Sequence, residues 1–192
     1  MKRVLVFLSM LALVFTSTYA QEAEAHLKFK GIAITGRIEN VVEQLKAEGY
    51  KLSSQSDGYA IMTGNFANSD CSILISATPQ SKQVYAVMVS YDEASSWISL
   101  QADYLILKKL LTQKYQVTPS SIESFLSPYE EGDGYELQAT QNNKCCHRSY
   151  YNIPHGDITL AILNKKISII YTDKSGKLIN EREEKAKALD DL

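Results

Sequence analysis

The sequence has little proline, glycine or cysteine and no large excess of one charge. Its 192 residues include four Pro, nine Gly and three Cys, and this composition excludes a collagen-like or a disordered chain. The 20 basic and 22 acidic side chains give a formal net charge of −2. A nucleic-acid-binding protein needs a basic surface to neutralise phosphates, so we expect no nucleic-acid partner. With 45% apolar residues, the composition is that of an ordinary globular protein.

Motifs of the common enzyme classes are also missing from the sequence. There is no G-x-S-x-G elbow, no phosphate-binding loop and no dinucleotide-binding fingerprint. The histidines, His26, His147 and His155, form no H-x-x-x-H pair, and no C-x-x-C pair is present. The acidic loop 130–133 lacks the alternating pattern of a calcium loop. We therefore predict no catalytic, metal-binding or cofactor-binding residues and favour a protein without catalytic activity, although the sequence leaves this open.

The first residues have the pattern of a secretory signal peptide. Lys2 and Arg3 precede an uncharged apolar stretch, residues 4–15, and Thr18 and Ala20 provide the small side chains of a cleavage site. A membrane anchor is the alternative, but a spanning helix needs roughly 20 apolar residues and this stretch is shorter. We predict cleavage after Ala20, no membrane span, and a protein that is periplasmic or secreted.

Apolar periodicity predicts two main helices. The first carries Ile38, Val41, Val42 and Leu45 on one face, at the spacing of an amphipathic helix. The second begins near Ser95 or Ser96 and ends near Lys114. Its stripe contains Trp97, Leu100, Tyr104, Leu107 and Leu111, and it is widened by Ile98, Leu105, Ile106 and Leu110. We therefore expect the second helix to be buried on more than one side.

Short apolar or alternating runs between turn residues predict the strands. We place them at residues 59–66, 71–77, 84–91, 135–140, 158–163 and 167–172. The segment 121–125 has both a capping-box spacing and an extended pattern, so it is either a helix or a strand. Residues 174–192 are rich in both charges and form a solvated helix or a frayed tail.

Two halves of the chain resemble each other. Asp57-Gly58-Tyr59 recurs as Asp133-Gly134-Tyr135, and each copy is followed by a strand, a polar turn and a cysteine. We predict a signal peptide (1–20), a polar lead-in (21–28), one domain (29–173) of two related halves (29–92 and 93–173), and the charged segment 174–192. The predicted fold is α+β, with tandem α-β-β-β(-β) units that form one antiparallel sheet and two helices packed on one face.

The other face of such a sheet is open to water. We expect it to carry Ser72, Leu74, Ser76, Thr159, Ser168, Thr172 and the polar side of segment 135–140. Our main hypothesis is an exported, non-catalytic interaction protein that binds another protein or an envelope component there, through Ser72, Ser76, Thr159, Ser168 and Thr172. The alternative is a small-molecule binder, or a hydrolase with dispersed carboxylates, that uses a pocket between sheet and helices.

Three cysteines, Cys71, Cys145 and Cys146, follow the signal sequence, and an oxidising compartment favours disulfides. We predict a bridge between Cys71 and Cys145 that ties the two halves together, because these cysteines occupy matching positions. A Cys71–Cys146 bridge, or no bridge, remains possible on the sequence. Cys145 could share a strand face with His147, as a thiol nucleophile would require, but no third orienting group is evident, so we expect a structural role.

Several segments resemble a group of uncharacterised secreted proteins from Bacteroidales gut bacteria. They are the signal peptide, F-K-G-I-A-I-T-G at 29–36, the Trp97 helix ending K-K-L-L-T-Q-K-Y at 115, E-E-G-D-G-Y-E-L-Q-A at 130–139 and the terminal D-D-L. The order of a helix and then strands, repeated, also resembles the β-lactamase-inhibitor-protein-like architecture, whose members are mainly binding or assembly proteins. These resemblances imply an exported interaction protein and name no reaction, since fold does not carry function.

Overall fold

A computed structural model describes residues 25–192 of the chain, and the predicted signal peptide lies outside this range. The first half contains β1 (Lys28–Phe29), β2 (Ile32–Ala33), α1 (Ile38–Ala47), β3 (Lys51–Gln55), β4 (Tyr59–Phe66), β5 (Ser69–Ala77) and β6 (Val84–Tyr91). The second half contains α2 (Trp97–Tyr115), β7 (Ser120–Ile122), α3 (Glu136–Gln141), β8 (Arg148–Ile153), β9 (Gly156–Leu163), β10 (Lys166–Asp173) and α4 (Lys174–Asp190).

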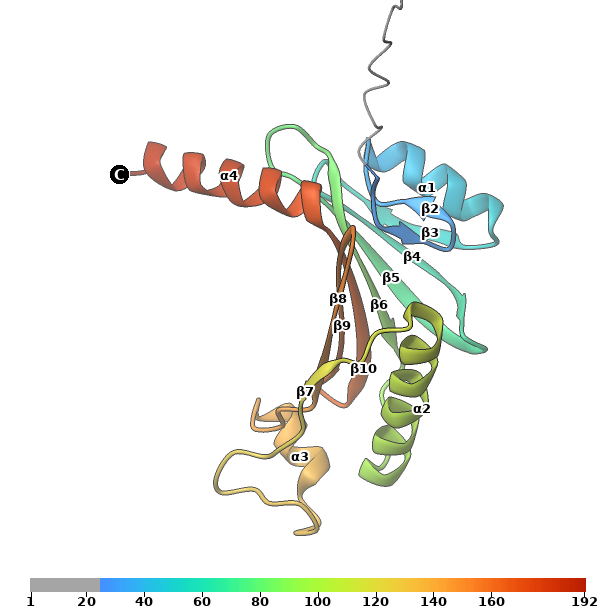
Figure 1. Cartoon of the computed structure of the whole chain (residues 1–192), viewed down its shortest axis with the longest axis vertical. Helices are drawn as coiled ribbons and strands as arrows, with labels where there is room; N and C mark the ends of the chain where they lie inside the picture. The colour runs from blue at the N-terminus through green and yellow to red at the C-terminus, as the bar shows by residue number, and fades with distance from the viewer. Residues whose placement is uncertain (1–24) are drawn as a thin grey trace, which may run out of the picture.

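One eight-stranded antiparallel sheet organises the chain (Figure 1). Its strand order is β3-β4-β5-β6-β10-β9-β8-β7. Each half therefore contributes a helix followed by four strands, and the last strand of each half pairs with the other at the centre of the sheet, where Val89 lies opposite Ile169. This arrangement confirms the predicted α+β fold with a single antiparallel sheet, although the second half carries α3 between β7 and β8. A relationship between the two halves stays a prediction. A two-stranded sheet, β1-β2, lies beside it.

Helices α1 and α2 cover the same face of the sheet (Figure 1). In α1 the predicted stripe Ile38, Val41, Val42 and Leu45 is buried, as its spacing requires. Helix α2 begins after Ser96, whose hydroxyl accepts a hydrogen bond from the Ser99 backbone N–H at 3.2 Å and so satisfies one of the free donors at the helix start. Both helices pack on the inward-facing side chains of the strands, and these form the core.

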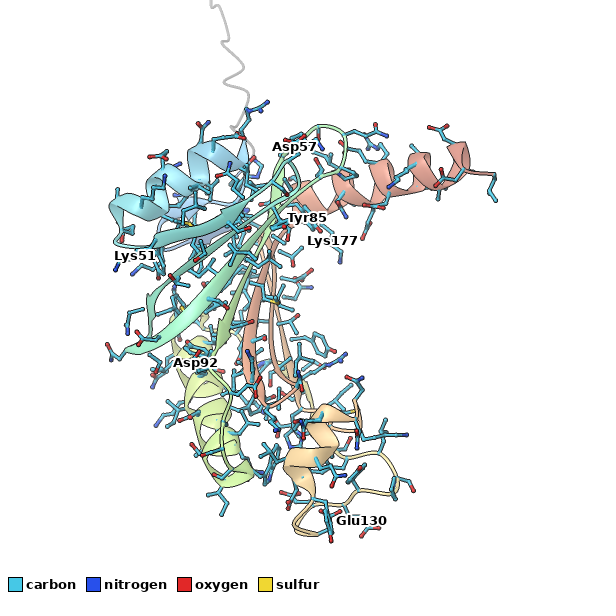
Figure 2. All side chains as sticks on the ribbon, turned by 180° about the vertical axis from the view of Figure 1, so that it is seen from behind. Lys51, Asp57, Tyr85, Asp92, Glu130 and Lys177 are labelled. Atoms are coloured by element: carbon cyan, nitrogen blue, oxygen red, sulfur yellow. The ribbon has the colours of Figure 1, made fainter. Side chains whose placement is uncertain are left out.

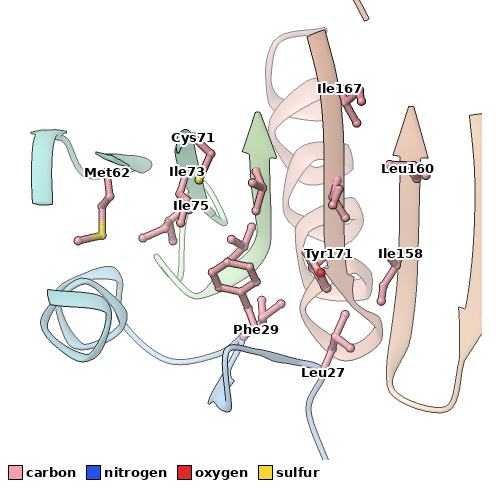
Figure 3. Close-up of a cluster of buried hydrophobic side chains, with 14 of the residues drawn as sticks. Leu27, Phe29, Met62, Cys71, Ile73, Ile75, Ile158, Leu160, Ile167 and Tyr171 are labelled. Carbon is pink, nitrogen blue, oxygen red and sulfur yellow. The ribbon is translucent and has the colours of Figure 1, made fainter. Parts of the chain in front are cut away.

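The N-terminal segment completes this core. Leu27, at the end of the predicted polar lead-in, and Phe29 on β1 are both buried. The Phe29 ring lies between Phe66 of the first half and Tyr171 of the second, at centroid distances of 5.3 and 5.2 Å. Figure 3 shows Phe29 beside Tyr171. The segment therefore contacts side chains of both halves.

The strand predicted over residues 135–140 is wrong, because this segment is the short helix α3. The Asp133 carboxylate accepts a hydrogen bond from the Tyr135 backbone N–H at 2.7 Å, and the Ala139 N–H donates to the Tyr135 carbonyl at 2.9 Å. Buried Ala139 and Thr140 then face the sheet. The alternation of apolar and polar residues in this segment is therefore not that of a strand. It belongs to a helix of about one and a half turns that is buried on one side.

Strands β3 and β8 were not predicted from the sequence, and the ambiguous segment 121–125 contributes to the edge strand β7. Strand β8 alternates between exposed and buried residues, but Ser149, the first of its three inward residues, is polar. The Ser149 hydroxyl lies 2.7 Å from the Tyr104 hydroxyl and 2.9 Å from that of Ser121. A hydrogen-bonded polar residue therefore occupies a core position of the strand.

Residues 174–190 form the helix α4, which settles the alternative left open for the charged C-terminal segment. The buried carboxylate of Asp173 accepts from the Gly176 N–H at 2.8 Å and caps the helix. Further along, the Glu183 carboxylate accepts from the backbone N–H groups of Gln80 and Ser81 in the β5–β6 loop. These contacts fix α4 at one end of the sheet, from which it projects (Figure 1).

Candidate binding face

The face of the sheet opposite α1 and α2 is called the open face here, and its side chains form rows across the strands. Residues directly opposite each other in an antiparallel sheet project to the same side, so the strand register defines each row. The central row contains Ile61, Leu74, Met88, Ile170, Thr159 and Tyr150, one from each of six neighbouring strands. Its four aliphatic members are half-buried, although no described helix covers them.

Two rows of mostly small and polar side chains flank the central row. One contains Tyr59, Ser76, Ala86, Thr172, Asp157 and Asn152, and the other contains Thr63, Ser72, Ser90, Ser168, Ala161 and Arg148. At about 4.8 Å between strands, each row spans roughly 24 Å. The open face is therefore a broad surface with an apolar centre and a polar margin.

All five residues predicted from the sequence as binding residues lie on the open face. Ser72, Ser76 and Thr172 belong to the flanking rows, and Thr159 belongs to the central row. Ser168 also faces this side, but only 4% of it is exposed, because its hydroxyl lies 3.2 Å from that of Ser90 on the adjacent strand. The polar side of segment 135–140 is not on this face, because the segment is α3. A binding role for the five residues stays a prediction.

Helix α4 adds a wall to one end of the open face. Gly176 packs closely on β6, since a Cβ atom at this position would lie 2.8 Å from the Tyr85 Cβ. Between α4 and strands β8, β9 and β10 lies a groove of about 630 Å³. It is lined by Tyr85, Ser120, Tyr150, Tyr151, Asn152, Asp157, Thr159, Thr172, Lys177, Asn180 and Glu181. Figure 2 shows Tyr85 and Lys177 at this junction of helix and sheet.

The groove carries charges of both signs together with neutral hydrogen-bonding groups. The Lys177 ammonium lies 3.9 Å from the Asp157 carboxylate, and both side chains are about half exposed. Tyrosine, serine, threonine and asparagine supply the remaining polar atoms, and such side chains are typical of surfaces that bind proteins with adaptable hydrogen bonds. Sequence analysis missed the contribution of α4. The sequence predicts a helix or a tail over residues 174–192, and Asp173 followed by Gly176 at a capping distance marks its start, but neither signal indicates that the helix borders the open face.

The covered side of the sheet contains the pair that a thiol nucleophile would use. The Cys145 Sγ lies 3.2 Å from the His147 Nδ1, and the His147 ring contacts the Trp97 and Phe125 rings. Burial raises the pKa of the Cys145 thiol to about 11 and lowers the pKa of His147. Both groups are thus uncharged at neutral pH, whereas nucleophilic attack needs the thiolate. The pKa shifts thus disfavour a reactive thiolate here, and a structural role for Cys145 stays a prediction.

The disulfide predicted between Cys71 and Cys145 is absent, and all three cysteines of residues 25–192 are free. Cys71 lies on β5, whereas Cys145 and Cys146 precede β8, four positions further along the sheet. At about 4.8 Å per strand this separation is roughly 19 Å, and a disulfide requires Cα atoms within about 7 Å. Matching positions in the two halves therefore do not place these cysteines together.

We expect native Cys146 to react with iodoacetamide at about pH 8 while Cys71 and Cys145 do not. Burial raises the pKa of both Cys71 and Cys145 to about 11, which leaves roughly one thiolate in a thousand at that pH, whereas Cys146 is only half-buried. Peptide mass spectrometry after a short exposure measures the modification. All three cysteines should react after denaturation without a reductant. Rapid native modification of Cys145 would contradict the assignment of a buried, inert thiol.

Stability is expected to fall as the pH drops from about 7.5 to 5.5, in part because His147 must stay neutral. Burial lowers its folded-state pKa below the usual 6.5, against the opposing charges of Glu123 and Glu131. Below that usual value the unfolded chain therefore binds a proton that the folded chain does not. Denaturant unfolding at both pH values gives the free energy of unfolding. Between pH 7.5 and 5.5 this free energy should fall less for His147→Phe than for the unaltered chain. An equal drop in both would exclude this cause.

The part of the chain that the structure describes contains no further site that indicates a function. Among residues 25–192, no group of three or more His, Cys, Asp or Glu side chains is arranged to hold a metal ion. No helix in this range is long and apolar enough to cross a membrane. Comparisons with protein-family models, curated proteins and solved structures found no match. The resemblance to secreted Bacteroidales proteins therefore stays a prediction.

Proposed function

We propose that the chain is an exported, non-catalytic interaction protein that binds a protein partner on its open face. The observation that carries this proposal is the uncovered central row, in which Ile61, Leu74, Met88 and Ile170 adjoin one another between two polar rows. An apolar centre with a polar margin is the common arrangement of protein–protein interfaces. Export rests on the signal sequence in residues 1–20.

The dimensions of the open face favour a protein over a small molecule. A row of roughly 24 Å across six strands matches the width of a protein contact, whereas a small ligand is usually enclosed in a deeper pocket. The groove beside α4 extends this surface with Tyr85, Tyr150, Asn180 and paired charges. A neutral, tyrosine-containing surface suits a partner that presents apolar side chains and hydrogen-bonding groups rather than a strongly charged one.

A substitution in the central row tests the proposal. Thr159→Lys places a long charged side chain between Ile170 and Tyr150, and we expect it to weaken partner binding by at least about tenfold, because a buried unpaired charge is costly at an interface. Gln44→Lys, on the exposed side of α1, introduces the same group on the covered side of the molecule and should have no effect.

The partner is first captured from envelope and culture fractions of the producing organism, identified by mass spectrometry and purified. Titration calorimetry with the purified partner then gives the dissociation constants of the unaltered chain and of the two variants. Melting curves verify that both variants fold. Equal affinities for all three proteins, or a loss with Gln44→Lys alone, would place the binding surface elsewhere and overturn the proposal.

A further inference from the structure

Helix α2 exposes aliphatic side chains on the side that faces away from the sheet. The exposed fractions are 80% for Ile98, 49% for Leu105, 56% for Ile106 and 47% for Leu110. The sequence predicts burial on more than one side of this helix, and within residues 25–192 nothing buries these four side chains. A cluster of exposed aliphatic residues on one helix indicates a surface that another molecule covers.

A groove runs beside this exposed surface. Ile106, Leu110, Leu107 and Asp103 of α2 form one wall, and the β4–β5 hairpin with Ala67, Ser69 and Asp70 forms the other. Tyr91 and Ile167 of the central strands also line the groove, whose volume is about 560 Å³. Ile106 and Leu110 thus belong both to the groove and to the exposed aliphatic surface, so one ligand can contact both.

The charged side chains that line the groove are all acidic. Asp70, Asp92, Glu93 and Asp103 line it, and none of the described lining residues is Lys, Arg or His. One of these carboxylates, that of Glu93, lies 3.8 Å from the Lys166 ammonium. An apolar wall with several carboxylates beside it is complementary to a chain that carries both aliphatic and cationic side chains.

We propose that this groove docks a cationic amphipathic segment of a second protein. The aliphatic side chains of that segment pack on Ile106 and Leu110, and its Lys or Arg side chains reach Asp70, Asp92 and Asp103, in the manner of an amphipathic helix in a groove. A second copy of this chain fits less well, because a symmetric dimer brings the same surface against itself and would place carboxylates against carboxylates.

The proposal does not depend on the open face. The apolar wall of the groove belongs to α2, which covers the side of the sheet opposite the open face, while Asp70 and Asp92 lie at the ends of β5 and β6. Figure 2 labels Asp92 at this end of the sheet. Thr159→Lys should therefore leave binding at this groove unchanged. If both surfaces bind, the chain joins two different partners across one sheet.

A synthetic peptide of Leu and Lys in the pattern of an amphipathic helix is the probe. Fluorescence anisotropy of the labelled peptide measures its binding to the full chain. The double variant Ile106→Ser/Leu110→Ser should weaken binding by at least about tenfold through lost apolar contact. Asp103→Asn should weaken it by a few fold at low salt, and this loss should shrink at high salt as screening increases.

Control variants carry comparable changes on α4, where Leu178 and Glu184 are exposed. Leu178→Ser and Glu184→Gln should leave peptide affinity unchanged, and a peptide with Glu in place of each Lys should not bind. Four results would overturn the proposal: no binding of the Lys peptide, equal binding of the Glu peptide, equal losses in the control variants, or sedimentation as a dimer that Ile106→Ser/Leu110→Ser abolishes. Because all substituted side chains are exposed, melting curves should stay near that of the unaltered chain.

Discussion

Gly156→Ala is expected to lower the free energy of unfolding by roughly 4 kcal/mol, or to prevent folding altogether. Gly156 is the first residue of β9 and lies opposite Asp173, the last residue of the central strand β10. A Cβ atom at this position would lie 2.1 Å from the Thr172 carbonyl oxygen and 3.1 Å from Leu27 Cδ2. Backbone cannot yield as a flexible side chain can, so β9 and β10 would have to separate.

Gly58→Ala provides the matched control for this prediction. No atom lies within 4 Å of a Cβ built on Gly58, so the same methyl group should change the free energy of unfolding by less than about 0.5 kcal/mol. Urea unfolding followed by tryptophan fluorescence compares the two variants with the unaltered chain. A loss of less than about 1 kcal/mol for Gly156→Ala would show that the contact between β9 and β10 is looser than the structure indicates.

Asp173→Ala is the second large effect, with an expected loss of about 3 kcal/mol. The Asp173 carboxylate is 1% exposed. It accepts from Gly176 N–H and Leu27 N–H, both at 2.8 Å, and lies 3.1 Å from the His26 ring nitrogen. One side chain thus joins the end of β10, the start of α4 and the N-terminal segment. Its removal leaves a buried N–H group unpaired and α4 without its cap.

Asp173→Asn should cost roughly half as much, because the amide oxygen can still accept one of the two backbone hydrogen bonds. Chemical unfolding gives the free energies, and far-ultraviolet circular dichroism reports the loss of α4. Trypsin should also cut faster at Lys174 and Lys177 in Asp173→Ala, since both lie in the first turns of α4. Equal stability of the Ala and Asn variants would show that the hydrogen bonds from the Leu27 and Gly176 N–H groups to this carboxylate do not stabilise the fold.

The parts of the fold that sequence analysis predicted are those with apolar periodicity. The stripe from Ile38 to Leu45 and the runs that became β5, β6, β9 and β10 each have an inward apolar side, which follows from local pattern alone. Strand β8 escaped prediction because Ser149 occupies the first of its inward positions, and the hydroxyls of Tyr104 and Ser121, distant in sequence, make that position favourable. Tertiary hydrogen bonding of this kind leaves no local signal.

The candidate site was predictable in the same limited way. Alternation on β5, β9 and β10 placed Ser76, Thr159 and Thr172 on an open face, but the order of strands decided which of them are neighbours. The burial of Ser168 beside Ser90, the wall formed by α4 and the separation of Cys71 from Cys145 all depend on that order. In helix α2 the sequence misleads in the opposite direction. Its wide aliphatic stripe predicts burial on more than one side, but part of that stripe is exposed in the folded chain.

Site-specific photo-crosslinking in the producing organism tests the central claim, that a protein partner binds the open face. A photoreactive amino acid replaces Ser76 or Thr159 on the open face, or Gln44 on the outer side of α1. The account predicts that the two open-face positions crosslink to the same protein and that Gln44 does not. Crosslinking of that protein from Gln44 alone, or no crosslink from either open-face position, would contradict it.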